Sequence, residues 1–356
     1  MTAAGRSEPE ILFDRRGAAG VVTLNRPHAL NAVTHAMVRA LAEKLHEWAR
    51  DPRVTRVVVT AAGERAFSAG GDLRALDDLR RAGRLDEALA FWREEYTLNA
   101  LIKHYSKPYV AVIDGIVMGG GVGVSIHGSH RVAGDRFQFA MPEVGIGFFP
   151  DVGATWFLPR MPGEAGTYCA LTGEHLRSAD GVAAGLATHR VATARFGDLV
   201  DALCGTVPVE AVLAAFAEPA GEGPTMARRA AIDRLLVGDR VEDILARLDA
   251  EAGAGGVDSA WARSTAATIR GKSPTSLKIA LAQVRRGPHW SFGECMRAEF
   301  RIVSRIVDGH DFYEGIRAVI LDKDNAPRWA PATLAAVSEA EVERHFAPLA
   351  QELGLA

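Results

Sequence analysis

The stretch DGIVMGGGVGVSIHGSHRVAGDRFQFAMPEVGIGFFPDVGATWFLPR (residues 114–160) brings three consecutive glycines, a glutamate and an aspartate into one segment. The run KPYVAVID (107–114) at its start is apolar and rich in valine, and predicts a buried strand. VSIHGSHRVA (124–133) predicts a short helix that returns to the sheet. The glycines at 119–121 therefore fall at a turn from strand to helix. Because glycine has no Cβ and the first helical amides are free, this turn suits a carbonyl oxygen that becomes negative.

A second loop, GERAFSAGGDLRAL (63–76), has the same design. It follows VTRVVVTAA (54–62), which predicts another buried strand, and it leads into a helix that we expect to begin near Asp72, with the Asp72 carboxylate as its cap. Each of the two turns can present one backbone amide to a single oxygen, and two such donors make an oxyanion hole.

The spacing of the glycines excludes the common phosphate-binding loops. Counting G-x-G-x-x-G from Gly119 or Gly121 puts Val124 or Ile126 at the last glycine position, and no Gly-Lys-Ser/Thr follows. For either turn alone, close packing of a strand against a helix stays an alternative role.

The flanking segments predict an α/β chain with a helical C-terminal part. Residues 11–27 alternate as a β-hairpin does, and residues 31–50 predict an amphipathic helix. Past residue 189 the sequence is rich in alanine, and apolar residues recur at helical spacing in 241–248. We therefore predict a core over 1–196 and a mostly helical region over 197–356.

The composition indicates a globular protein. With 356 residues, 48% of them hydrophobic, the chain can bury a large core, and a net charge of -3 without a basic stripe predicts neither nucleic acid nor a membrane surface as partner. Three cysteines, far apart and odd in number, disfavour disulfides and a thiolate metal cluster. The first ten residues lack the apolar core of a secretion signal, and no apolar run reaches the roughly 18 residues of a membrane span. We expect a cytoplasmic location.

Three segments together resemble the enoyl-CoA hydratase/isomerase (crotonase) superfamily: AFSAGGDL, KPYVAVIDGIVMGGGVGVS and FAMPEVGIGFFPDVG. The last of them is similar to the 3-hydroxyisobutyryl-CoA hydrolase branch, as are KSPTSLKIAL (272–281) and GHDFYEGIRAVILDKDNAPRW (309–329), so the resemblance covers nearly the whole chain. It implies a crotonase-like spiral of repeated ββα units with a helical C-terminal region. In the superfamily such helices cover the acyl-CoA site or build a trimer, so the resemblance also implies a homo-oligomer.

The resemblance assigns roles to five residues. It places the amides that hold the thioester oxygen at Gly71 and Gly120, an acidic residue that contacts substrate at Glu95, and further acidic site residues at Glu143 and Asp151. Glu95 has an acidic neighbour, Glu94, which makes its assignment the less specific one.

One position departs from the hydratase pattern. Hydratases of this superfamily use two glutamates, one at the position of Glu143 and one shortly after the glycine triplet, where this chain has Gly123. Glycine has no group that moves a proton, which argues against a hydratase. Asp151, in PDVG, follows the hydrolase pattern instead.

The two acids also stand out physically, because apolar or small residues surround each of them. A carboxylate is seldom buried without a hydrogen-bonding or catalytic reason, and desolvation raises its pKa and makes it a better base near neutral pH. A turn or helix cap after Pro150 is an alternative role for Asp151, and a structural role after Pro142 is one for Glu143.

Other reactive residue types fit a structural role better. Ser125 misses the G-x-S-x-G elbow because His127 occupies the last glycine position, so we predict that it packs inside a helix. His127 and His130 lack an acidic partner at metal-ligand spacing and are predicted on a helix surface or at its end. Cys169 is predicted in the core.

The resemblance and the residues together predict hydrolysis of a short branched 3-hydroxyacyl-CoA, with 3-hydroxyisobutyryl-CoA as favoured substrate, a step of valine catabolism. Coenzyme A arrives as part of the substrate, and no metal or redox cofactor is required. Glu143 either attacks the carbonyl or activates water; the sequence leaves both routes open. Two alternatives remain: an enoyl-CoA isomerase or hydratase-type enzyme with Glu143 as base, and a non-catalytic acyl-CoA-binding protein.

Overall fold

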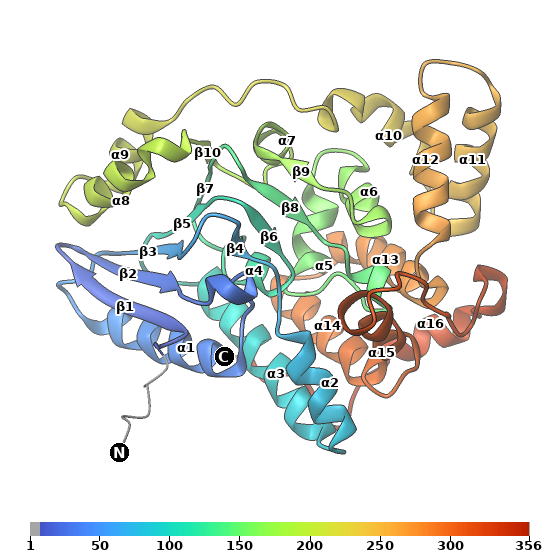
Figure 1. Ribbon diagram of the computed structural model, residues 1–356, viewed down its shortest axis with the longest axis horizontal. Coiled ribbons are helices and arrows are strands. Elements are labelled where there is room, and N and C mark those ends of the chain that lie inside the picture. Colours follow the sequence, from blue (N-terminus) through green and yellow to red (C-terminus); the bar gives the residue numbers. More distant parts are fainter. Residues whose placement is uncertain (1–7, 356) are drawn as a thin grey trace.

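The computed structural model describes residues 8–355 as two β-sheets with helices around them (Figure 1). The strands are Ile11–Arg16 (β1), Ala19–Leu24 (β2), Arg56–Ala61 (β3), Ala66–Ser68 (β4), Tyr109–Ile113 (β5), Ile116–Met118 (β6), His130–Ala133 (β7), Gln138–Ala140 (β8), Leu176–Arg177 (β9) and His189–Arg190 (β10). One sheet has six strands in the order β1-β2-β3-β5-β7-β10, and the other has four in the order β4-β6-β8-β9.

From β3 to β8, successive strands alternate between the two sheets, and this alternation makes a spiral. β3 belongs to the six-stranded sheet and β4 to the other, and the same step repeats from β5 to β6 and from β7 to β8. Neighbouring strands of successive turns are parallel. All five residues of β5 are buried, as expected for a parallel strand covered on both faces. The predicted spiral α/β fold is confirmed.

The N-terminal prediction is confirmed for the hairpin and partly wrong for the helix. β1 and β2 pair antiparallel, but the helix predicted over 31–50 spans only His35–Arg50 (α1). Asn31 has a φ of 53°, and its side-chain amide donates to two carbonyl oxygens around β4. The helix therefore starts later, where the Thr34 hydroxyl accepts a hydrogen bond from the Met37 amide at 3.2 Å.

The helix predicted over 124–133 is wrong. Helical structure after the glycine turn is limited to Gly120–Gly123 (α4), and the end of the segment is strand β7. The backbone of β7 pairs with β5, so sheet pairing overrides the local pattern. The helix predicted near Asp72 is confirmed as Leu73–Arg81 (α2), and the Asp72 carboxylate accepts from the Ala75 amide at 3.4 Å.

The other helices lie around the sheets or pack on one another. They are Leu85–Lys103 (α3), Ala154–Phe157 (α5), Ala165–Thr172 (α6), Ser178–Ala183 (α7), Phe196–Cys204 (α8), Val209–Phe216 (α9), Arg229–Leu235 (α10), Val241–Gly253 (α11), Ser259–Arg270 (α12), Pro274–Arg286 (α13), Phe292–Ile306 (α14), Asp311–Ile316 (α15) and Glu339–Phe346 (α16). α8 and α9 pack on one face of the six-stranded sheet, and α1 and α3 pack on the other.

The C-terminal helices share the core of the spiral. One cluster of buried apolar side chains includes residues from Ile11 to Leu353, and α14 contacts α3 while α15 contacts α2 (Figure 1). The boundary between 1–196 and 197–356 stays a prediction. Across the part of the chain that the structure describes, the helices are too short or too polar to cross a membrane.

Candidate active site

A cavity of about 380 Å³ lies between the two glycine turns, α3 and the C-terminal helices. All five residues to which the resemblance gives roles line it: Gly71, Glu95, Gly120, Glu143 and Asp151. Most of the other lining side chains are apolar, and they include Phe91, Trp92, Phe148, Phe312, Val319 and Ile320.

The two glycine turns contact each other in this cavity. Gly70 and Gly119, which precede the predicted donors, have φ values of 115° and 43°, a conformation that glycine adopts readily. A Cβ on Gly120 would lie 3.4 Å from the nitrogen of Gly71, so the two amides are neighbours. Within residues 8–355, neither amide has a hydrogen-bond partner. Two free, adjacent amides can donate to one oxygen.

Glu143 begins the short 3-10 helix Glu143–Ile146 (η2) and lies beside these turns. A Cβ on Gly119 would lie 3.4 Å from the Oε1 atom of Glu143. The residue is 6% exposed, and its Oε2 atom has no hydrogen-bond partner among the described residues. Burial, and then the negative charge of Asp151, raise the pKa of Glu143 well above its ordinary value. Glu143 is thus a buried acid with a free oxygen at the cavity.

Asp151 approaches the same cavity from the loop before α5. Its Oδ2 atom accepts a hydrogen bond from the Tyr96 hydroxyl at 2.9 Å. Burial raises the pKa of Asp151 to about 7, although the Tyr96 hydrogen bond acts in the opposite direction. The sequence analysis did not single out Tyr96, because a tyrosine within a helix carries no local sign of a polar role.

The structure distinguishes Glu95 from its neighbour Glu94. Glu95 is buried against the glycine turn, where a Cβ on Gly120 would lie 2.7 Å from its Oε1 atom. Burial, and then the charges of Asp151 and of another buried glutamate, raise the pKa of Glu95 well above its ordinary value. Glu94 lies on another face of α3 and pairs with Arg39 at 2.6 Å, which lowers its pKa. Only Glu95 lines the cavity.

Glu95, Glu143 and Asp151, which we call the cavity carboxylates, share one electrostatic character. For each of them burial is the largest influence on the pKa and raises it, and no cation offsets this within the part of the chain described here. Titratable groups with raised pKa values in one cavity are typical of sites for proton transfer or nucleophilic attack.

The position of the second hydratase glutamate is filled by other side chains. A Cβ on Gly123 would lie 2.8 Å from the Nδ2 atom of Asn99 and 3.0 Å from the Cβ atom of Val152. Asn99 is fully buried, and its side-chain nitrogen and oxygen lack hydrogen-bond partners in the described residues. The site therefore has no room for an acid at residue 123 without displacement of Asn99 and Val152. Asn99, too, gave no sequence signal.

Ser125 is buried, which confirms its packing role, but it lies in the turn after α4 and not inside a helix; the prediction for His127 is wrong as well. The Ser125 hydroxyl donates to the Gly121 carbonyl oxygen at 2.8 Å. His127 is buried rather than on a helix surface, because the segment turns inward before β7. Burial lowers its pKa to about 3. The neutral ring places Nε2 at 2.7 Å from the Val152 carbonyl oxygen, to which it donates.

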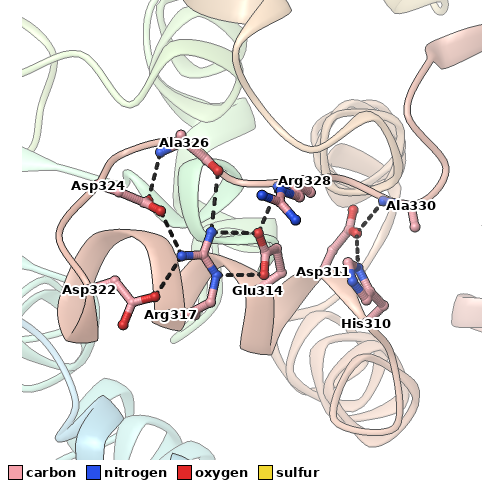
Figure 2. Close-up of polar contacts among 9 residues, drawn as sticks. All are labelled: His310, Asp311, Glu314, Arg317, Asp322, Asp324, Ala326, Arg328 and Ala330. Carbon is pink, nitrogen blue, oxygen red and sulfur yellow. Dashed lines mark hydrogen bonds and ion pairs between the residues drawn. The ribbon is translucent and has the colours of Figure 1, made fainter.

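One wall of the cavity belongs to a π-helix, Arg317–Leu321 (η7), whose Val319 and Ile320 face the cavity. Figure 2 shows how its first residue is held. The Arg317 guanidinium binds three carboxylates at 2.7–2.8 Å, and we call this group the Arg317 cluster. Its acidic members are Glu314, Asp322 and Asp324. The cluster fixes the chain reversal that presents the apolar wall.

Comparisons with known proteins agree with a spiral fold that carries two glycine turns and buried acids. A sequence model of the enoyl-CoA hydratase/isomerase family matches residues 19–346. The 3-hydroxyisobutyryl-CoA hydrolase, mitochondrial, of Danio rerio is 44% identical and covers 97% of this chain and 91% of its own length. The corresponding protein of Homo sapiens is 39% identical over 96% of this chain and 89% of its own length.

Solved structures show the same fold. A carnitinyl-CoA dehydratase from Mycobacterium thermoresistibile has a TM-score of 0.91 at 44% identity and covers 97% of this chain and 98% of that one. An enoyl-CoA hydratase from Rhodobacter sphaeroides 2.4.1 has a TM-score of 0.90 at 39% identity, with 98% and 100% covered. Fold and site thus define a crotonase-fold protein. The chain belongs to the enoyl-CoA hydratase/isomerase family.

The predicted cytoplasmic location is contradicted. The hydrolases that match nearly the whole chain are named as mitochondrial. The three cysteines are free and buried, as expected in a reducing environment. Free thiols do not distinguish one reducing compartment from another, so the composition could not support the location inferred from it.

Proposed function

We propose that this chain hydrolyses the thioester of a short branched 3-hydroxyacyl-CoA, with 3-hydroxyisobutyryl-CoA as the favoured substrate. The observation that carries the proposal is the pair of free amides at Gly71 and Gly120 beside the Glu143 carboxylate in one apolar cavity. Relatives named 3-hydroxyisobutyryl-CoA hydrolase, matched over nearly the full chain, support the same reaction.

The glycine amides stabilise the charge that develops during the reaction. Attack on the thioester carbon moves an electron pair onto the carbonyl oxygen, and the amides of Gly71 and Gly120 donate to that oxygen. Removal of one such donor costs about 10²–10³ in kcat in comparable sites. The close contact between the two turns keeps both donors at one point.

Glu143 can lead to the products by two routes, as a nucleophile or as a base. As a nucleophile, its carboxylate forms a mixed anhydride with the acyl group, CoA leaves as thiolate and takes up a proton, and water then splits the anhydride. As a base, it removes a proton from water while the oxygen of that water attacks the carbonyl, and the proton passes to the departing sulfur. The raised pKa of Glu143 favours proton uptake near neutral pH.

Asp151 and Glu95 complete the proposed site. Asp151, held by the Tyr96 hydroxyl, orients the 3-hydroxyl group of the substrate or the attacking water. A substrate without that hydroxyl leaves a buried carboxylate without its partner, so it is turned over more slowly. Glu95 contacts the substrate next to the Gly120 donor.

A hydratase is the second candidate, because the two structures with TM-scores of 0.90 and 0.91 are a hydratase and a dehydratase. Asn99 and Val152 occupy the space of the second hydratase glutamate, which favours hydrolysis. An isomerase with Glu143 as its single base would exchange the α-proton without release of thiol. The proposed hydrolysis uses no metal or redox cofactor, and CoA enters with the substrate. Assembly into a homo-oligomer stays a prediction.

The test is release of free CoA thiol from 3-hydroxyisobutyryl-CoA and from isobutyryl-CoA, which lacks the hydroxyl. We expect rapid release from the hydroxylated substrate, slow release from the other, and loss of both in Glu143→Ala. Glu94→Ala is the matched control, because that glutamate is paired on another face of α3. Absence of thiol with either substrate would refute hydrolysis, and unchanged turnover in Glu143→Ala would remove Glu143 from the reaction.

A further inference from the structure

The loop 150–155, which carries Asp151, has a conformation that its own sequence disfavours. Val152 has a φ of 51° and Gly153 a φ of 92°. A β-branched residue with such a φ is an outlier, and it persists only where the surroundings determine it. The groups that hold this loop therefore decide where the Asp151 carboxylate points.

Glu299, on α14, holds the loop from the C-terminal side. Its two carboxylate oxygens accept hydrogen bonds from the amides of Gly153 at 2.7 Å and Thr155 at 2.9 Å. On the other side of the chain, the His127 ring donates to the Val152 carbonyl oxygen at 2.7 Å. His127 and Glu299 thus hold the C=O and the N–H of one peptide group, the one between Val152 and Gly153, and Glu299 also holds the amide of Thr155.

Gln283, on α13, adds a third contact to the same loop. Its side-chain amide donates to the Pro150 carbonyl oxygen at 3.0 Å and lies 2.8 Å from the Thr155 hydroxyl. The backbone is thus fixed before and after Asp151, and two of the three holding side chains come from the C-terminal helices. Tyr96 then donates to a carboxylate whose backbone is held on both sides.

Glu299 has no other evident use. It is 0% exposed, it does not line the cavity, and in the described residues no cation pairs with it. Burial raises its pKa to about 8. A buried acid without a cation is costly, and the two backbone amides are the partners that offset this cost.

We propose that Glu299 is a positioning residue that, through the amides of Gly153 and Thr155, keeps the Asp151 carboxylate on Tyr96 and in the cavity. The inference rests on the proposed hydrolase function. It assigns part of the catalytic geometry to α14, outside the spiral that carries the reacting groups.

The main test is the variant Glu299→Gln, which keeps the shape of the side chain. One of the two oxygen acceptors becomes an NH₂ group, which cannot accept a hydrogen bond from the backbone amide that it faces. We expect kcat for thiol release to fall by about 10²-fold, as displaced catalytic groups do, with KM changed by less than about threefold. The control is Asp180→Ala, which removes the Oδ1 atom that two backbone amides use. Asp180 is also 0% exposed and accepts from two backbone amides, at 3.0 and 2.8 Å, in a loop that does not line the cavity.

A double-mutant cycle separates positioning from loss of stability. In an Asp151→Asn background, we expect Glu299→Gln to lower kcat by less than about threefold, because the group that it positions is already changed. Thermal unfolding should show a loss of Tm in both Glu299→Gln and Asp180→Ala, whereas only Glu299→Gln loses kcat. Equal kcat losses in both, or a full additive loss in the cycle, would overturn the inference.

A replacement variant and the activity of the wild type keep the test of Glu299 decisive. If Glu299→Gln does not fold, Gln283→Met tests the same loop, and wild-type kcat in that variant overturns the inference. Failure of the proposed function is visible separately, because the wild type would then release no thiol from 3-hydroxyisobutyryl-CoA. An active wild type with an equally active Glu299→Gln refutes the positioning role alone.

Discussion

The cavity carboxylates and the Arg317 cluster use the same kinds of side chain in opposite ways. In the Arg317 cluster a guanidinium binds every carboxylate, and it lowers the pKa of Glu314 to about 2 (Figure 2). In the cavity, burial raises the pKa of both Glu143 and Asp151, and the charge of Asp151 raises that of Glu143 further. The difference lies in the partner: acids that shape the wall have a cation, whereas the acids at the glycine turns have none among the described residues.

Within these two groups, the contrast distinguishes acids that hold the wall of the cavity from acids that line it beside the glycine turns. A paired carboxylate stays ionised and holds chain segments together. An unpaired buried carboxylate lowers the stability of the fold and gains the ability to move a proton near neutral pH. Substitutions in the two groups should therefore affect different properties.

The largest expected effect is on catalysis, from removal of a cavity carboxylate. We predict that Glu143→Gln lowers kcat by about 10³-fold, because neither attack nor proton removal remains possible. Steady-state thiol release measures it, and Glu94→Gln should keep kcat within about twofold of wild type. A Glu143→Gln enzyme within tenfold of wild type would place the reacting acid elsewhere.

The next largest effect is expected from a change at the Gly120 amide, the proposed oxyanion donor. Gly120→Ala should lower kcat by about 10²–10³, because the new Cβ would meet the Glu95 carboxylate at 2.7 Å and displace the oxyanion donor. Gly197→Ala is the control, since a Cβ there meets nothing within 4 Å. Equal activity of the two variants would argue against the Gly120 amide as a donor.

A smaller effect should appear in the pH dependence. The negative charge of Asp151 raises the pKa of Glu143, so Asp151→Asn should lower that pKa. The acid limb of the kcat/KM profile, which reports the essential base, should then move to lower pH while the maximum rate falls. A limb that stays in place would mean that another group sets it.

The smallest effects, on stability, should have opposite signs in the two groups. The pKa of Glu143 is higher in the folded state than in the unfolded state, so the fold loses stability as pH rises and this carboxyl group ionises. Glu143→Gln removes that loss. The variant should therefore have a higher Tm than the wild type, and the difference should be larger at pH 8 than at pH 5. The pKa of Glu314 is lowered from 4.5 to about 2 in the folded state. The ionised carboxylate therefore stabilises the fold above about pH 4.5, and this stabilisation is lost as pH falls toward 2. Glu314→Gln should lower Tm at pH 7 and lose this effect toward pH 2, as thermal unfolding can show.

The parts of the fold with a local signal were predictable. The valine-rich runs of β3 and β5 and the two glycine turns are apparent in the chain, because burial and close approach constrain residue type at each position. Glu143 and Asp151 stood out because apolar neighbours surround them. The resemblance supplied the rest of the predicted site.

Residues that reach the site through tertiary packing gave no such signal. Tyr96 and Asn99 belong to a helix whose polar side chains look ordinary in sequence, and Glu299 comes from a helix more than a hundred residues away along the chain. The local pattern predicts a helix around His127, whereas the structure has a turn there between α4 and β7. In each case the contact partner, rather than the local sequence, defines the role.

The packing around Gly123 restricts how this family could exchange one activity for another. A glutamate at this position requires space that Asn99 and Val152 occupy, so a single substitution there damages the fold before it adds a proton donor. Smaller side chains at positions 99 and 152 would have to open that space first. In this chain, a second acid at position 123 therefore requires changes at residues that carry no reacting group.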